Sequence, residues 1–251
     1  MIIRSERATL LAVVGFVALA APFASPVFGL KTAAMKVPPE LAADAIRLPV
    51  SGFGGKNRGE FTIGDFSGEF TRIESRLAIF DPAYASSRGT ASFAIAGPGI
   101  DGRLRADCSF KENVVTLGVV TFDSKKLAFV CELDSSSGGT VGRVVLGEPR
   151  PEGFKQRLLA RAARTGAAEI GATRLELASV HEYEGSRFKS QTPTGYVVTS
   201  NASVVGALEL TDVNPTIFVA SSLSDDDRRS TMLAALAVSL LRDPAVSTLG
   251  D

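Results

Sequence analysis

The segment MLAALAVSLL near the end of the chain, residues 232–241, carries a single polar side chain, Ser239. As an α-helix it is about 15 Å long, because each helical residue adds about 1.5 Å, whereas a helix that spans a bilayer needs about 20 residues. A helix that is apolar on every side is stable only where it is buried on every side. We therefore expect a helix enclosed by the rest of the fold, with Ser239 bonded to the Ala235 carbonyl inside the helix.

The residues before and after this segment favour the same helix. Ser224 is a good N-cap, and the chain has an aspartate three residues later, as a capping box requires. The run Asp225 to Asp227 places negative charge at the start of the helix, where the helix dipole favours it, and Pro244 ends the helix. A metal site at the three aspartates is the weaker alternative, because adjacent side chains of a helix point in different directions.

Most of the chain between residue 58 and this helix has the alternation of a β-protein. In GRLRADCSF, residues 102–110, Leu104, Ala106 and Cys108 share one face, and polar side chains occupy the other. Short runs separated by Gly, Pro and Asp are typical of an antiparallel barrel or sandwich. Besides 102–110, strands are expected near 58–64, 67–72, 75–81, 89–97, 113–122, 125–133, 140–147, 172–183, 194–199, 203–211 and 215–221.

Two segments depart from the β pattern. Residues 153–171, GFKQRLLARAARTGAAEIG, contain many good helix formers and few β-branched residues, which predicts a helical insertion near 152–169. Residues 31–57 contain Pro38, Pro39 and Pro49 and end in a glycine-rich stretch, so they are interpreted as a tether. The expected organisation is therefore a single β-barrel domain at 58–250 that follows a tether and an N-terminal segment.

Residues 1–30 have the pattern of a secretory signal peptide. Arg4 and Arg7 precede an apolar run, and Ala18-Leu19-Ala20 is a small-x-small cleavage candidate. An uncleaved membrane anchor is the alternative, because residues 8–30 are long enough to span a bilayer, although two prolines would disrupt that helix. Both interpretations predict an exported protein, in the periplasm or elsewhere in the cell envelope, with residues 8–30 as its anchor if they are retained.

Residues 208–243, LELTDVNPTIFVASSLSDDDRRSTMLAALAVSLLRD, give the order strand, turn, strand, acidic helix start and apolar helix. This order, after about twelve candidate strands, resembles the tubby-like C-terminal domain superfamily, which also includes phospholipid scramblases and plant LURP-one proteins. The resemblance is one of architecture. It implies a mainly β fold, an antiparallel closed barrel of about twelve strands around a hydrophobic C-terminal helix. A β-sandwich with one covering helix is the alternative.

The two cysteines, Cys108 and Cys131, fall on the apolar faces of predicted strands. Export favours a disulfide between them. If 102–110, 113–122 and 125–133 formed a simple meander, however, the middle strand would hold the two Cα atoms about 10 Å apart, and a disulfide tolerates at most about 7 Å. Either the strand order is not a meander, or the cysteines are buried thiols.

The composition offers little for catalysis or cofactor binding. The net charge is zero, so no general attraction to nucleic acid is expected. The chain has one histidine and no cluster of His and Cys at metal-ligand spacing, so no metal or other cofactor is predicted. A hydrolase would depend on His181, and the chain lacks a G-x-S-x-G elbow. A non-enzymatic binding or scaffolding module is therefore favoured, with a hydrolase of unrecognised site as an alternative.

One group of basic residues suggests a ligand. Lys155, Arg157, Arg161 and Arg164 would share a face of the predicted helical insertion. Arginine suits phosphate, so this stripe is the candidate anion- or lipid-binding site, and a solvated helix face is the alternative. The candidate partners are accordingly a protein of the cell envelope or a phospholipid. The resemblance to tubby proteins, which bind phosphoinositides, points to the same class of ligand, but no residue matches a recognised head-group pocket.

Overall fold

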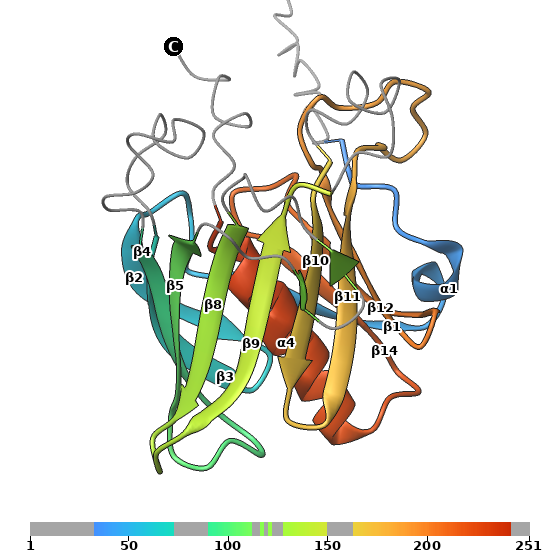
Figure 1. Ribbon diagram of the computed structural model, residues 1–251. Helices are drawn as coiled ribbons and strands as arrows, with labels where there is room; N and C mark the ends of the chain where they lie inside the picture. The colour runs from blue at the N-terminus through green and yellow to red at the C-terminus, as the bar shows by residue number, and fades with distance from the viewer. Residues whose placement is uncertain are drawn as a thin grey trace, which may run out of the picture. The chain divides into compact units, whose positions relative to one another are not determined.

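A closed antiparallel barrel dominates the computed structural model, which describes residues 33–72, 90–111, 116–117, 120–121, 128–149 and 163–241 (Figure 1). The strands follow one another around the barrel in the order β1-β14-β13-β12-β11-β10-β9-β8-β5-β4-β3-β2. Their bounds are β1 Ala45–Ser51, β2 Arg58–Ile63, β3 Phe66–Thr71, β4 Thr90–Ala96, β5 Leu104–Lys111, β8 Ala128–Ser135, β9 Thr140–Gly147, β10 Thr165–Ile170, β11 Thr173–Val180, β12 Gly195–Ser200, β13 Ser203–Glu209 and β14 Thr216–Ala220. The predicted fold class is confirmed, and the sandwich alternative is wrong.

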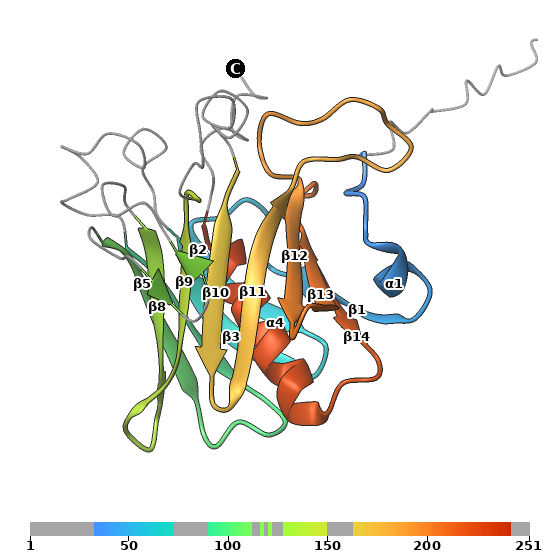
Figure 2. The ribbon, with the colours of Figure 1, turned by 45° about the vertical axis from the view of Figure 1, so that its right-hand side comes forward.

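The C-terminal helix α4, Asp225–Ser239, runs through the middle of this barrel (Figures 1 and 2). Its residues Met232 to Val238 are at most 2% exposed. Strand β13 can approach the helix because position 206 is glycine: a Cβ atom there would lie 2.5 Å from the Thr231 methyl group. The apolar segment is therefore enclosed by strands, as the absence of a polar face predicts.

The polar side chain inside the helix is satisfied, but by a different carbonyl than expected. Ser239 Oγ donates to the Leu236 carbonyl at 2.7 Å, whereas the sequence suggested Ala235. The last turn of the helix is tightened: the Leu240 and Leu241 amides donate to carbonyls three residues earlier, at 3.3 and 3.0 Å. A serine hydroxyl in a helix can bond the carbonyl either three or four residues earlier.

The tether predicted for residues 31–57 is wrong over its described part. Residues 45–51 form β1, which closes the barrel by pairing with β14 and β2. The prolines suggested a tether because proline is disfavoured inside sheets. Pro49 is tolerated because β1 pairs with β2 only at Val50 and Ser51, so that side of β1 is largely an edge. The glycine-rich stretch after β1 is also part of the domain, because the Phe53 side chain in it is fully buried.

Residues 33–44 lie against the outside of the barrel and include a short helix, α1, Pro39–Ala42. Met35 and Leu41 are at most 2% exposed, and they pack on Ala207 and Phe218 from the outer surface of β13 and β14. The N-terminal part of the domain is therefore fastened to the barrel wall by an apolar cluster of its own.

Two further expectations about elements need correction. Residues 165–170, placed in a helical insertion, form β10, while residues 150–162 lie outside the described residues. The described part of 113–122 does not join the barrel: β6, Thr116–Leu117, and β7, Val120–Thr121, pair only with each other, and Leu117 packs outside the barrel on β8, β9 and β10. The strand predicted at 75–81 lies outside the described residues.

Candidate functional site

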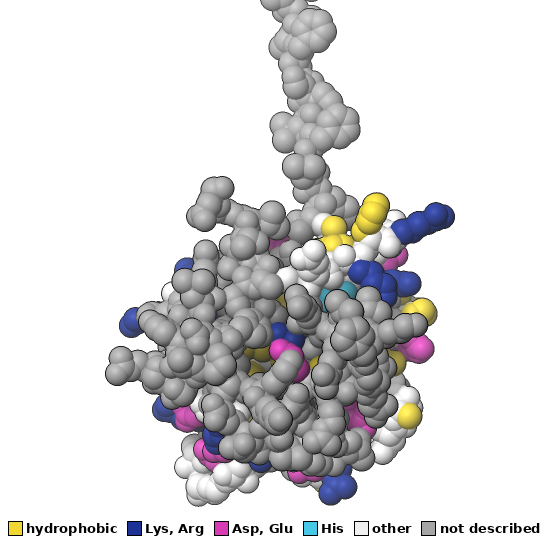
Figure 3. Space-filling view, turned by 45° about the horizontal axis from the view of Figure 1, so that its top comes forward, with side chains coloured by type: hydrophobic (Ala, Val, Ile, Leu, Met, Phe, Trp, Pro, Cys, Tyr) yellow, Lys and Arg dark blue, Asp and Glu magenta, His cyan; other side chains and the backbone are white. Residues whose placement is uncertain are grey.

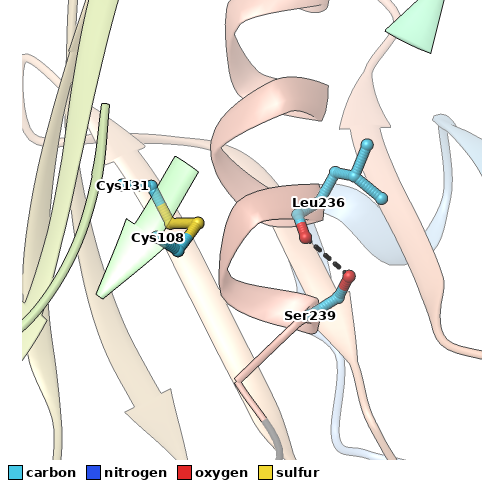
Figure 4. Close-up of a disulfide and its surroundings, with 4 residues drawn as sticks. All are labelled: Cys108, Cys131, Leu236 and Ser239. Carbon is cyan, nitrogen blue, oxygen red and sulfur yellow. Dashed lines mark hydrogen bonds between the residues drawn. A yellow bond between two sulfur atoms is a disulfide. The ribbon is translucent and has the colours of Figure 1, made fainter. Parts of the chain in front are cut away.

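The two cysteines form a disulfide inside the barrel. Strand β5 pairs directly with β8, so Cys108 and Cys131 face each other with their Cα atoms 3.9 Å apart. Both side chains are buried in the core, and the bond lies beside α4 (Figure 4). The meander was the wrong assumption, because β8 pairs directly with β5, while β6 and β7 pair only with each other. The expected pairing is present, and the alternative of two free thiols is wrong.

The basic stripe is described only at Arg164; Lys155, Arg157 and Arg161 lie outside the described residues. Arg164 is 7% exposed, so it does not lie on a solvated helix face. Its Nη1 atom is 3.7 Å from Glu148 Oε1, and its backbone amide donates to Ser179 Oγ at 2.9 Å. Arg164 is therefore buried next to the first residue of β10, where it pairs with the partly buried Glu148. A shared anion site with the other three residues stays a prediction.

His181 follows the last residue of β11 and links this strand to the loop of residues 181–194. Its Nε2 atom is 3.1 Å from Ser179 Oγ, and its Nδ1 atom is 3.1 Å from the Ser190 carbonyl. Ser179 is two residues away on the same side of the strand, so the pair follows from the β repeat. Because the serine oxygen also accepts from the Arg164 amide, these contacts favour a structural role for the histidine. The spacing of two residues could have revealed this contact in the sequence.

The most distinctive surface feature is the tip of that loop, residues 186–189, hereafter the loop tip. Phe188 is 85% exposed, and it stands between Arg187 and Lys189. The tip is held in place: the Phe188 amide donates to Ser186 Oγ at 3.0 Å, and Lys189 Nζ contacts Glu182 Oε1 at 2.7 Å. That hydrogen bond from Lys189 is the main cause that lowers the pKa of the Glu182 carboxyl. Sequence reasoning missed this tip, because exposure of a lone phenylalanine cannot be read from a polar loop.

The first described residues of the chain run beside this loop. The Glu184 amide donates to the Ala34 carbonyl at 2.8 Å, and the Lys36 amide donates to the Glu182 carbonyl at 3.0 Å. Met35 forms an isolated bridge with Tyr183, and its amide donates to Glu209 Oε1 at 2.8 Å. Figure 3 looks onto this end of the barrel, where hydrophobic and basic side chains gather at the edge near the histidine. Residues 34–36 therefore lie along residues 182–184 of the same loop as the tip.

Three shallow hollows in the described part of the barrel wall are each lined by charges of both signs. Two of them lie over β2, β3 and β4 and are lined by both acidic and basic residues. Arg103 and Glu69, which line one of them, form an exposed ion pair at 3.2 Å. Charges of both signs that pair with one another are typical of a sheet face exposed to solvent, and they leave no excess charge to attract an ion. Within the described residues, no group of three or more His, Cys, Asp or Glu side chains is arranged to hold a metal ion.

The aspartates at the start of α4 cap the helix, as predicted. The Asp227 amide donates to Ser224 Oγ at 3.2 Å, and that hydroxyl donates to Asp227 Oδ2 at 2.7 Å. Thr173, the first residue of β11, donates to Asp227 Oδ1 at 2.9 Å. Asp225 and Asp226 pair with the arginines three residues later. The acidic cluster is thus used for helix capping and for joining the helix to β11.

The carboxyl of Asp227 makes stability depend on pH. The hydroxyl of Ser224, and then that of Thr173, lower its pKa below the ordinary value. A carboxyl with a lowered folded-state pKa stabilises the fold above its unfolded pKa, about 3.9, and this contribution is lost as the pH falls through the lower folded value. We expect Asp227→Asn to be less stable than the wild type in urea at pH 7, with the difference narrowing below about pH 4.

Asp225→Asn is the matched control for this prediction, since it removes one charge from the same helix start and leaves the Ser224 and Thr173 contacts in place. Equal unfolding free energies of Asp227→Asn and the wild type at pH 7 would show that these hydrogen bonds do not stabilise the helix start.

Comparisons of the chain with protein-family models, with curated proteins and with solved structures find no match. The tubby-like superfamily therefore remains a resemblance of architecture. Among the helices in the described ranges, none combines the length and the apolar character needed to cross a membrane.

Proposed function

We propose that this protein is an exported, non-enzymatic module of the cell envelope, which the N-terminal segment holds at the membrane and which binds or positions a partner with its outer surface. The observation that carries the proposal is the position of α4. In a barrel that stores a ligand, the interior is open; here the helix and the inward-facing side chains form one continuous core. A partner is then bound on the outside or at one end, which is the architecture that tubby-like proteins also have.

The disulfide supports export. Such bonds persist in secreted, periplasmic and cell-surface proteins and are rare in the reducing cytosol. Cys108 and Cys131 are at most 2% exposed, so their bond is part of the core rather than an accessible redox pair.

Residues 33–44 belong to the barrel domain whether the apolar run is cleaved or retained, since Met35 and Leu41 are buried against the barrel wall. A retained run 8–30 would end a few residues before Ala34 and would hold the barrel close to the bilayer, whereas cleavage would release it. The proposal takes the retained form.

Export is tested with the full chain produced in a bacterium and fused at its C-terminus to a reporter enzyme that is active only outside the cytoplasm. We expect reporter activity, and we expect its loss when Leu10→Arg and Val14→Arg interrupt the apolar run. An alkaline wash of the membrane fraction then separates the two forms. A washed membrane that retains the chain supports the anchor; a soluble, shortened chain supports export with release; an inactive reporter on the unchanged chain overturns the proposal.

A further inference from the structure

The loop tip combines an apolar side chain with positive charge at a fixed place on the domain. Single exposed hydrophobic residues are common on proteins and need no explanation by themselves. Phe188 differs in being 85% exposed on a loop whose two neighbouring residues are cationic and whose base is fixed by hydrogen bonds. An aromatic ring with adjacent Arg or Lys suits the bilayer interface, where the ring enters the acyl boundary and the cations meet phosphate groups.

The position of the tip relative to the N-terminal segment is limited by chain length. Leu30 is the last residue of the apolar run, and Ala34 is four residues later, a distance that an extended chain covers in at most about 14 Å. The Ala34 carbonyl is bonded to the Glu184 amide in the same loop as the tip. If residues 8–30 span the bilayer, the short chain between Leu30 and Ala34 holds this loop close to the membrane surface.

The loop and the start of α4 lie at opposite ends of the barrel. The loop follows the last residue of β11, whereas Thr173, the first residue of that strand, is bonded to Asp227 at the start of α4. The other two carboxylates at that start are each paired with an arginine three residues later. Near the tip, Lys189 is paired with Glu182, and Arg187 adds a positive charge next to Phe188. A loop tip that faces the membrane therefore places the start of α4 on the far side of the barrel.

We propose that the loop tip is a membrane contact: Phe188 inserts into the interface of a phospholipid bilayer, and Arg187 meets the lipid phosphates. The proposal rests on the anchored form of the proposed function and adds to it the face that the domain turns to the membrane. It also predicts that the opposite end of the barrel is presented to partners in the surrounding compartment.

The absence of tryptophan from the chain makes a direct test simple. The full-length Phe188→Trp variant is placed in vesicles of phosphatidylcholine and phosphatidylglycerol, and its fluorescence is recorded with ordinary and with brominated lipids. We expect emission at a shorter wavelength than in detergent-free buffer and loss of intensity with the brominated lipids. The matched control is Val141→Trp: Val141 is 37% exposed and lies at the opposite end, where its carbonyl accepts from the Gly171 amide. Its emission should stay unquenched.

The outcomes separate this inference from the proposed function. If the chain floats with the vesicles but the Phe188→Trp emission stays water-like and unquenched, the membrane contact is overturned and the anchor stands; a tip that serves a protein partner would give this result. If the chain does not float with vesicles, both the anchor and the contact are overturned. Quenching in both the Phe188→Trp and the Val141→Trp variants would also overturn the proposed orientation.

Discussion

Replacing Leu236 by Asp is expected to prevent the barrel from folding. Leu236 is fully buried in the middle of α4, within the main core. Removing a buried leucine side chain costs about 2–5 kcal/mol, and an unpaired carboxylate in the same place costs several kcal/mol more. The sum is comparable with the whole stability of a typical domain, about 5–15 kcal/mol. The measurement is far-UV circular dichroism with urea unfolding, in which the variant should show no cooperative transition.

The control for this prediction is Leu236→Met, which keeps the volume and the apolar character and should cost less than about 1.5 kcal/mol. A cooperative unfolding transition of Leu236→Asp at the wild-type urea concentration would mean that the side chain is solvated, and the enclosed helix would be disproved.

Removing the disulfide is expected to give the second largest effect. The bond closes a loop with a sequence separation of 23 residues. The loss of loop-closure entropy in the unfolded chain corresponds to about 3 kcal/mol for such a loop. We therefore expect the double variant Cys108→Ala, Cys131→Ala to unfold at a clearly lower urea concentration than the oxidised wild type.

Wild-type protein with its disulfide reduced is the matched reference, since it keeps both sulfur atoms in the core. Its stability should lie close to that of the double variant, and protein made in a reducing cytosol should behave in the same way. An oxidised wild type no more stable than either form would show that the bond does not stabilise the fold, and the support that it gives to export would be lost.

The enclosed helix could be predicted from the sequence because its evidence is local. A run without a polar face, too short to cross a bilayer, has few other places to be stable, and the residues from Ser224 onward mark its start. The alternation at 102–110 was equally clear, because β5 has one side in the core and the other in solvent. These features depend on neighbours in the sequence and not on distant contacts.

The elements that sequence reasoning missed depend on distant contacts. Strand β10 consists of TGAAEI, which has the composition of a helix, yet Gly166 and Ala168 suit a strand that packs tightly in the barrel wall: a Cβ atom at position 166 would lie 2.6 Å from the Val145 carbonyl. Strand β1 was hidden by Pro49. The expected number of about twelve was reached partly through 113–122, whose described residues pair only as β6 with β7, while β1 and β10 were not counted.

In the candidate site, too, the features set by sequence neighbours could be predicted and those set by distant contacts could not. The pairing of the two cysteines was expected from the compartment, but the reason that they can meet, direct pairing of β5 with β8, is a property of the topology. Arg164 was assigned to an exposed stripe because it has helical spacing from Arg157 and Arg161. In the structure it lies next to the first residue of β10, buried, and pairs with Glu148. The loop tip could not be found from sequence, because its exposure depends on the whole fold.

Amide hydrogen exchange of α4 tests the central claim, a helix enclosed by a closed barrel, most directly. An enclosed helix cannot open unless the strands separate, so amides of residues 231–240 should exchange only through global unfolding, with the same free energy as amides of β4 and β5. Exchange of these helix amides at a lower free energy, while the strands remain protected, would show that α4 detaches from an intact barrel and would contradict the account.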